Sequence, residues 1–171
     1  TLFVGVLDPT RLMLRYVNAG HNPQYILRAT GDIETLASTG LPVGLLPGRG
    51  YEERTLSVGA GDLLFLYTDG AVEVQNEAGD MFGAERLQQL LRGHATAGVD
   101  EMLACVESGL RDFRGSAEPF DDATMMAMLA IASRGMRSGH QRRSARHSRI
   151  SSAGPAANAD TRKRGASIAV S

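Results

Sequence analysis

The sequence predicts an α+β domain in which a meander-like antiparallel β-sheet packs against two helices. Short apolar runs separated by turn residues recur from residue 2 to residue 67, which is typical of antiparallel strands. Two segments with apolar residues at helical spacing follow between residues 84 and 113. The 171 residues, 43% of them hydrophobic, suffice for one sizeable core, so we expect one globular domain.

Turn residues set the bounds of the expected elements. The segments 8–11 and 30–32 place turn-forming residues between two apolar runs, and each predicts a hairpin. The expected strands are residues 2–7, 12–17, 24–28, 33–36, 51–58, 63–67 and 125–131. The expected helices are residues 84–92 and 99–113, whose apolar residues should face the sheet.

The net charge of −1 hides two regions of opposite sign. Residues 1–133 hold nine arginines and 18 acidic residues, a net charge of −9, whereas residues 134–171 hold nine basic residues and Asp160, a net charge of +8. The second region is rich in Arg, Ser and Ala, so it has too little apolar surface to offset its chain entropy. We therefore predict a domain at 1–133 and a disordered basic tail at 134–171.

Three interpretations of the basic tail stay open. Clustered arginines could bind the phosphates of nucleic acid or anionic lipid, although the tail has no aromatic residue for base stacking. A solvated extension without a partner fits the composition equally well, and contact with the acidic domain is a third option. Nucleic acid is the least favoured partner, and we assign no function to the tail.

Composition favours a cytoplasmic protein. No apolar run approaches the roughly 20 residues of a membrane span, and the N-terminus lacks the basic and apolar pattern of a signal peptide. Cys105 is the single cysteine, which excludes an internal disulfide and a multi-cysteine zinc site.

The stretch GDLLFLYTDGAVEV (61–74) places a carboxylate where an apolar strand ends. Residues 63–67 are apolar and rich in aromatic side chains, and Thr68-Asp69-Gly70 follows them directly. Gly70 permits a close approach of main chain or ligand beside Asp69. A carboxylate on a rigid strand end suits a hard cation, whereas Asp-Gly by itself also fits an ordinary hairpin turn.

A second acidic motif favours the metal interpretation. Asp121 and Asp122 precede the apolar run 125–131, so another carboxylate lies at a strand end. Mg²⁺ and Mn²⁺ sites are commonly built from paired carboxylates, because these ions prefer oxygen ligands. The alternative for this aspartate pair is a solvated turn.

Two of the four histidines, His21 and His94, lie in the predicted domain at 1–133 and outside the acidic motifs. His21 could act as a general acid or a metal ligand, but beside glycine and Asn-Pro we interpret it as a residue that hydrogen-bonds a turn. His94 follows Gly93, where a helix should end, and has no feature that favours a site.

Five motifs occur in order along the chain: NAGHNP (18–23), GLPVGL (40–45), GDLLFLYTDGAVE (61–73), FGAERL (82–87) and DDATMMAML (121–129). This series resembles the metal-dependent protein phosphatases of the SpoIIE/RsbU type, within the PPM superfamily. The resemblance covers about residues 1–133, and the ordered series is far more specific than any one motif.

The resemblance implies an antiparallel β-sandwich flanked by helices in αββα layers, with two Mg²⁺ or Mn²⁺ ions held by aspartates at one end. In the family a metal-bound water attacks the phosphorus of a phosphoserine or phosphothreonine. Asp69 matches the metal aspartate of the family's Thr-Asp-Gly motif, and Asp121 matches its last metal aspartate. Gly70 and Asp122 would lie in the outer shell of the site.

The chain departs from the family pattern at its N-terminus. Before the matched region, family members carry a motif in which an aspartate precedes a Gly-His-Gly, and this aspartate bridges both ions. They also carry helices there that cover one face of the domain. No such segment precedes the strand at 2–7, and the chain begins with Thr1 rather than Met. We therefore expect a domain incomplete at its N-terminus, with at most one ion held by Asp69 and Asp121.

Two functions are compatible with this pattern. The first is a serine/threonine phosphoprotein phosphatase, a hydrolase of which this chain is the C-terminal portion, expected to be inactive by itself. Its substrate would be a phosphoprotein, and the family suggests an anti-sigma-factor antagonist. The second is an inactive phosphatase-like module that binds a partner in a signalling or sigma-factor pathway.

Overall fold

The computed structural model describes residues 1–118, 122–131, 148–152 and 166–170. Its strands are β1 Leu2–Asp8, β2 Met13–Ala19, β3 Gln24–Leu27, β4 Ile33–Leu36, β5 Arg54–Ser57, β6 Leu63–Tyr67, β7 Thr124–Leu129, β8 Ser148–Ser152 and β9 Ala166–Val170. Its helices are the short 3-10 helix η1 Asp69–Ala71, α1 Gly83–Gly93 and α2 Val99–Arg114. None of the described helices is long and apolar enough to cross a membrane.

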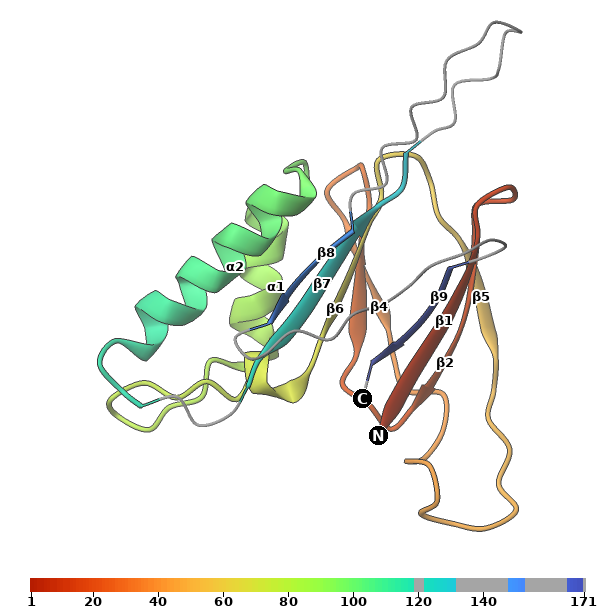
Figure 1. Ribbon diagram of the computed structural model, residues 1–171, viewed down its shortest axis with the longest axis horizontal. Helices are drawn as coiled ribbons and strands as arrows, with labels where there is room; N and C mark the ends of the chain where they lie inside the picture. The colour runs from red at the N-terminus through yellow and green to blue at the C-terminus, as the bar shows by residue number, and fades with distance from the viewer. Residues whose placement is uncertain (119–121, 132–147, 153–165, 171) are drawn as a thin grey trace, which may run out of the picture.

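The strands form two antiparallel sheets that face each other. The first sheet has the strand order β5-β2-β1-β9, and the second has the order β4-β3-β6-β7-β8. Figure 1 shows α1 and α2 on the outer side of the second sheet, so the described layers run helix, sheet, sheet. The predicted antiparallel strands and the β-sandwich implied by the family resemblance are confirmed.

Two apolar clusters hold these layers together. The cluster between the sheets contains Phe3, Leu14, Tyr16, Ile26, Leu36, Val58, Leu64, Leu66 and Ile168. The cluster between the second sheet and the helices includes Tyr25, Phe65, Tyr67, Leu87, Leu91, Met102 and Val106. Strand β6 supplies side chains to both clusters, and all five of its residues are buried. Since burial of one such side chain contributes about 1.5–3 kcal/mol, β6 is held firmly in place and offers a rigid strand end for a site.

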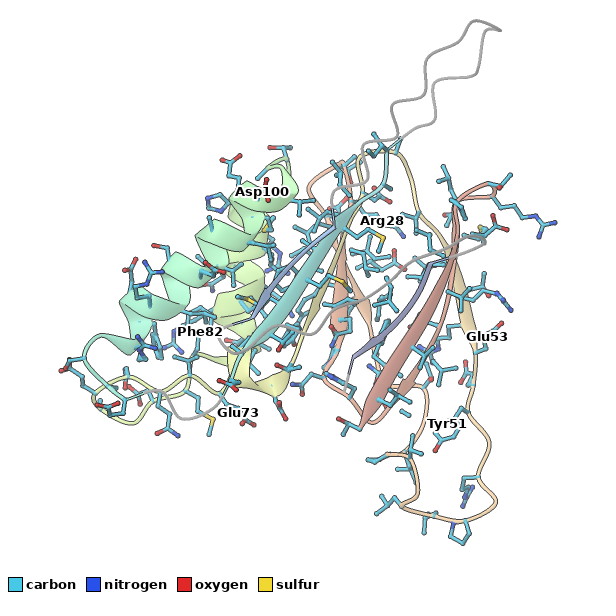
Figure 2. All side chains as sticks on the ribbon, viewed as in Figure 1. Arg28, Tyr51, Glu53, Glu73, Phe82 and Asp100 are labelled. Atoms are coloured by element: carbon cyan, nitrogen blue, oxygen red, sulfur yellow. The ribbon has the colours of Figure 1, made fainter. Side chains whose placement is uncertain are left out.

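Specific contacts join the two helices to each other and α1 to the second sheet. The Phe82 ring, labelled in Figure 2, meets the Phe113 ring edge-on, with centroids 5.2 Å apart. The Gln88 side chain of α1 donates a hydrogen bond of 3.2 Å to the Tyr25 hydroxyl on β3. Both predicted helices are confirmed, and no helix end differs from the predicted one by more than one residue.

Of the seven predicted strands, β4 and β6 have the predicted bounds; β1, β3 and β7 differ from them by one or two residues, and β2 and β5 differ for reasons that the structure shows. Leu12 has a φ of 53°, in the left-handed region, so it belongs to the hairpin turn and β2 begins at Met13. The expected strand at 51–58 is reduced to β5, Arg54–Ser57. The residues before β5 form a long loop, and Figure 2 shows Tyr51 near the end where this loop rejoins the first sheet.

Strands β8 and β9 lie within residues 134–171, for which the sequence predicts a disordered tail. Each is antiparallel to its neighbour and lies at the edge of a sheet: β8 pairs with β7, and β9 pairs with β1. Edge pairing uses main-chain N–H and C=O groups, so a segment with few apolar residues can make it. The structure therefore differs from the prediction at these two strands. The rest of 134–171 lies outside the described residues, and the domain boundary at 133 stays a prediction.

Candidate metal-binding site

Strand β6 carries Asp69 to one end of the second sheet. The buried strand ends at Tyr67, and Asp69 opens η1 as an exposed side chain. One carboxylate oxygen of Asp69, Oδ1, accepts a hydrogen bond of 3.2 Å from the Gly70 N–H. The structure thus has the predicted abrupt change from apolar strand to carboxylate.

Thr68 joins the end of β6 to the start of β7. Its N–H donates a hydrogen bond of 3.0 Å to the Thr124 carbonyl oxygen, and its hydroxyl oxygen Oγ1 accepts one of 3.1 Å from the Thr124 N–H. These two bonds fix the Asp69 segment and the segment that contains Asp122 side by side. The two acidic motifs, more than 50 residues apart in the sequence, therefore meet at one end of the sheet.

Gly70 makes this approach possible. A Cβ atom built on residue 70 would lie 2.4 Å from the carbonyl oxygen of Asp122 and 2.9 Å from its carbonyl carbon. Real Cβ atoms do not come so close, so only glycine fits here. Asp122 is exposed, whereas Asp121 lies outside the described residues.

The NAGHNP segment lies beside the Asp69 end of β6. Asn18 is fully buried, and its Oδ1 accepts a hydrogen bond of 2.8 Å from the His21 N–H. His21 is 6% exposed, and burial lowers the pKa of its imidazole, although the nearby charge of Asp69 acts in the opposite direction. The main chain of His21 takes part in the turn, whereas its ring nitrogen Nδ1 lies 3.4 Å from the Gln24 amide nitrogen, so the predicted turn role of the side chain stays a prediction.

The GLPVGL loop begins next to the same segment. A Cβ atom on Gly20 would lie 2.5 Å from the Pro42 side chain, so the two loops are in close contact. Farther along, the loop exposes large apolar side chains to solvent: Leu41, Val43, Leu45, Leu46 and Tyr51. Four of the five sequence motifs therefore contribute to one end of the molecule: NAGHNP, GLPVGL, and the two acidic motifs.

The donor chemistry at this end fits a hard divalent cation, which prefers carboxylate oxygens. The side chain of Asp69 is exposed, and the close approach at Gly70 brings Asp122 next to it. Among the described residues, no three His, Cys, Asp or Glu side chains are grouped so that they could hold a metal ion. A cation site here would therefore depend on Asp121 as well.

His94 lies away from this end and contacts the single cysteine. Its Nδ1 is 3.1 Å from the Cys105 sulfur and 3.1 Å from the Leu90 carbonyl oxygen. Burial raises the pKa of the Cys105 thiol, and the charge of Glu101 adds to this effect. The thiol form is therefore favoured, and we assign no catalytic role to this pair.

Comparison with known proteins identifies similar sequences. The family model for stage II sporulation protein E (SpoIIE) matches residues 1–130. Protein IcfG of Synechocystis is 35% identical over 128 residues, which cover 75% of this chain and 20% of IcfG. The phosphoserine phosphatase RsbU of Bacillus subtilis is 25% identical over 132 residues, which cover 75% of this chain and 38% of RsbU.

A solved structure has the same fold. The RsbU and RsbW domains of a Mycobacterium tuberculosis protein superpose with a TM-score of 0.61 at 27% sequence identity, covering 73% of this chain and 34% of that one. The chain thus spans well under half the length of each of these relatives.

Proposed function

This chain belongs to the SpoIIE/RsbU family of PPM-type phosphatase domains, and on that premise we propose that it supplies part of a metal centre that hydrolyses phosphoserine or phosphothreonine in a protein. The observation that carries the proposal is the contact between Gly70 and the Asp122 carbonyl oxygen, because it brings the two acidic motifs together. Asp69 and Asp121 are the proposed ligands. A bound Mg²⁺ or Mn²⁺ ion would lower the pKa of a water molecule and neutralise charge on the phosphoryl oxygens.

Each described residue of the site has a separate part in this proposal. The Asp69 carboxylate would bind the ion, and the Gly70 N–H orients this carboxylate by its hydrogen bond to Oδ1. Thr68 and Thr124 hold the two strand ends at a fixed separation, so the strand end that carries Asp69 is already in place when the ion binds. Gly70 and Asp122 shape the contact next to the ligands.

The number of ions follows from the number of carboxylates. Two aspartates supply ligands for one ion, whereas the family mechanism uses two ions with the water between them. We therefore propose that residues 1–171 alone hold at most one ion and turn over a phosphoprotein slowly or not at all.

The substrate and location are proposed from the relatives. RsbU is a phosphoserine phosphatase, which supports a phosphoprotein substrate here, with an anti-sigma-factor antagonist as the first candidate. We place the reaction in the cytoplasm. A second function, a binding module without turnover, is favoured by one observation, namely that the described residues group no three metal-ligand side chains.

A fusion experiment separates the enzyme from the binding module. The segment that precedes the matched region in RsbU would be joined to Thr1, and phosphate release from a phosphoserine protein would be measured in Mn²⁺. The enzyme proposal predicts Mn²⁺-dependent turnover by the fusion, little or none by residues 1–171, and loss of the fusion's turnover after Asp69→Asn. A folded fusion that binds Mn²⁺ but releases no phosphate would contradict the enzyme proposal and favour the binding module.

A further inference from the structure

The side chain of Gln24 makes an unusual pair of hydrogen bonds at the end of β6. Gln24 is fully buried at the start of β3. Its Oε1 accepts a hydrogen bond of 2.8 Å from the Tyr67 N–H, and its Nε2 donates one of 3.2 Å to the Tyr67 carbonyl oxygen. One side-chain amide thus satisfies both main-chain polar groups of Tyr67.

The geometry reproduces what a neighbouring strand would do. Strand β3 pairs with β6 from Leu27 opposite Leu63 up to Tyr25 opposite Phe65, and the pairing stops there. Tyr67 lies two residues farther along, where the β3 side of the chain has reached Pro23, which has no N–H to donate. On its other edge Tyr67 pairs with Met125 of β7. The Gln24 amide therefore replaces the missing main-chain partner.

The same amide also reaches the NAGHNP segment. Its Nε2 donates a hydrogen bond of 2.8 Å to the Asn22 carbonyl oxygen and lies 3.4 Å from Nδ1 of His21. With the nitrogen beside two carbonyl oxygens and the oxygen beside an N–H, only one orientation of the amide satisfies all partners. Gln24 thus ties this segment to the strand end that precedes Asp69.

We propose that Gln24 is a positioning residue for the metal site: its amide extends the β3–β6 pairing to Tyr67 and so fixes the point from which Asp69 projects. This inference rests on the proposed function, because it takes Asp69 as a metal ligand. Without the amide, the buried N–H of Tyr67 would lose its hydrogen-bond acceptor, and the strand end would shift to find another.

A second side-chain clamp at the opposite end of the same strand pair provides a matched control. Arg28, which follows β3, donates a hydrogen bond of 2.6 Å to Asp62, which precedes β6. Figure 2 shows Arg28 and Glu73, four residues beyond Asp69, toward opposite ends of the second sheet. Removing the Asp62 carboxylate should destabilise the strand pair without moving Asp69.

The test compares Gln24→Met with Asp62→Asn in the full chain. Methionine has a similar length to glutamine but cannot form either hydrogen bond. Mn²⁺ affinity would be measured by calorimetry well below the melting temperature of each variant, and exchange of the Tyr67 amide proton would be followed by NMR without metal. We expect Gln24→Met to weaken Mn²⁺ binding up to about tenfold, the lower end of the loss that follows removal of a group bonded directly to a ligand. Exchange of the Tyr67 amide proton should speed by at least about tenfold, because its N–H loses its hydrogen-bond partner. Asp62→Asn should leave Mn²⁺ affinity within about twofold.

Each other outcome overturns the inference in a recognisable way. Unchanged Mn²⁺ affinity in Gln24→Met, with normal binding by the unchanged chain, contradicts the positioning role alone. Equal losses in both variants would mean that affinity follows stability, which also contradicts it. No Mn²⁺ binding by the unchanged chain contradicts the proposed metal site itself. If Gln24→Met does not fold, the unchanged chain still decides: a Tyr67 amide that exchanges much faster than that of Phe65 overturns the clamp.

Discussion

Gly70 and Asp122 are in contact across the ends of β6 and β7, where a Cβ atom on residue 70 would lie 2.4 Å from the Asp122 carbonyl oxygen. The contact joins the Thr-Asp-Gly motif to the Asp-Asp motif through main-chain atoms. The relative position of the two motifs therefore depends on residue 70 having no side chain.

Replacing Gly70 by alanine should separate the two acidic motifs. The added methyl group would push against main chain rather than a flexible side chain, so we expect a loss of about 1–3 kcal/mol in the free energy of unfolding. Mn²⁺ binding should also weaken, because the displaced residue, Asp122, directly follows the proposed ligand Asp121 in the sequence. Urea unfolding and calorimetry measure the two effects.

The matched control for this change is Gly50→Ala. Residue 50 lies in the long loop with nothing within 4 Å of its Cβ position and no positive φ, so the same substitution should leave both quantities unchanged. A Gly70→Ala variant as stable as Gly50→Ala would show that the two strand ends are free to separate.

The pH dependence of stability should report on Asp62. Burial raises the pKa of its carboxyl, but hydrogen bonds from the Ala29 N–H, the Arg28 guanidinium and the Gly59 N–H outweigh burial, so the pKa is lowered from 3.8. A folded-state pKa below the unfolded value stabilises the protein above the unfolded pKa, and this stabilisation is lost as the pH falls through the folded value.

Comparison with Asp62→Asn isolates this contribution. At pH 7 the variant should be less stable by about 1–3 kcal/mol, because a charged acceptor of several hydrogen bonds has been replaced. The difference from the unchanged protein should shrink below about pH 4, as the carboxyl takes up a proton. Chemical unfolding at pH 7 and pH 3 gives both values, and a difference that is the same at both would contradict the assignment.

The register in which β9 pairs with β1 can be tested by disulfide cross-linking. Val4 of β1 lies opposite Ala169 of β9. In a Cys105→Ser background, Val4→Cys with Ala169→Cys should form an intramolecular disulfide under mild oxidation. Val4→Cys with Ala166→Cys is the control, because Ala166 lies opposite Leu7, three residues and about 10 Å farther along β1. Cross-links between two chains, or equal yields in both pairs, would contradict the pairing.

Local patterns in the sequence predict the elements that carry the site. The apolar run before Asp69 is bounded by turn residues on both sides, so β6 and the carboxylate at its end are predictable from residues 61–70 alone. Helices α1 and α2 follow from their apolar spacing in the same way. The Asp69–Asp121 ligand pair stays a prediction, since Asp121 lies outside the described residues.

Features that depend on distant contacts could not be predicted. The Gln24 side chain bonds to Tyr67, 43 residues away, and no local signal distinguishes it from a glutamine exposed on a strand. The role of Gly70 is visible only once the Asp122 carbonyl is in place. Ile168 is the one residue of β9 described as buried and apolar. The pairing of β9 therefore depends on the free main-chain edge of β1, which lies at the other end of the sequence.

Calorimetric titration of Mn²⁺ into the full chain tests the central claim, that Asp69 and Asp121 together hold a divalent cation. We expect the unchanged chain to bind Mn²⁺, and we expect Asp69→Asn and Asp121→Asn each to bind it about tenfold more weakly or worse. Asp32→Asn, the same change of charge at an exposed turn between β3 and β4, should bind as the unchanged chain does. Equal Mn²⁺ affinity in the unchanged chain and in both site variants would contradict the metal site.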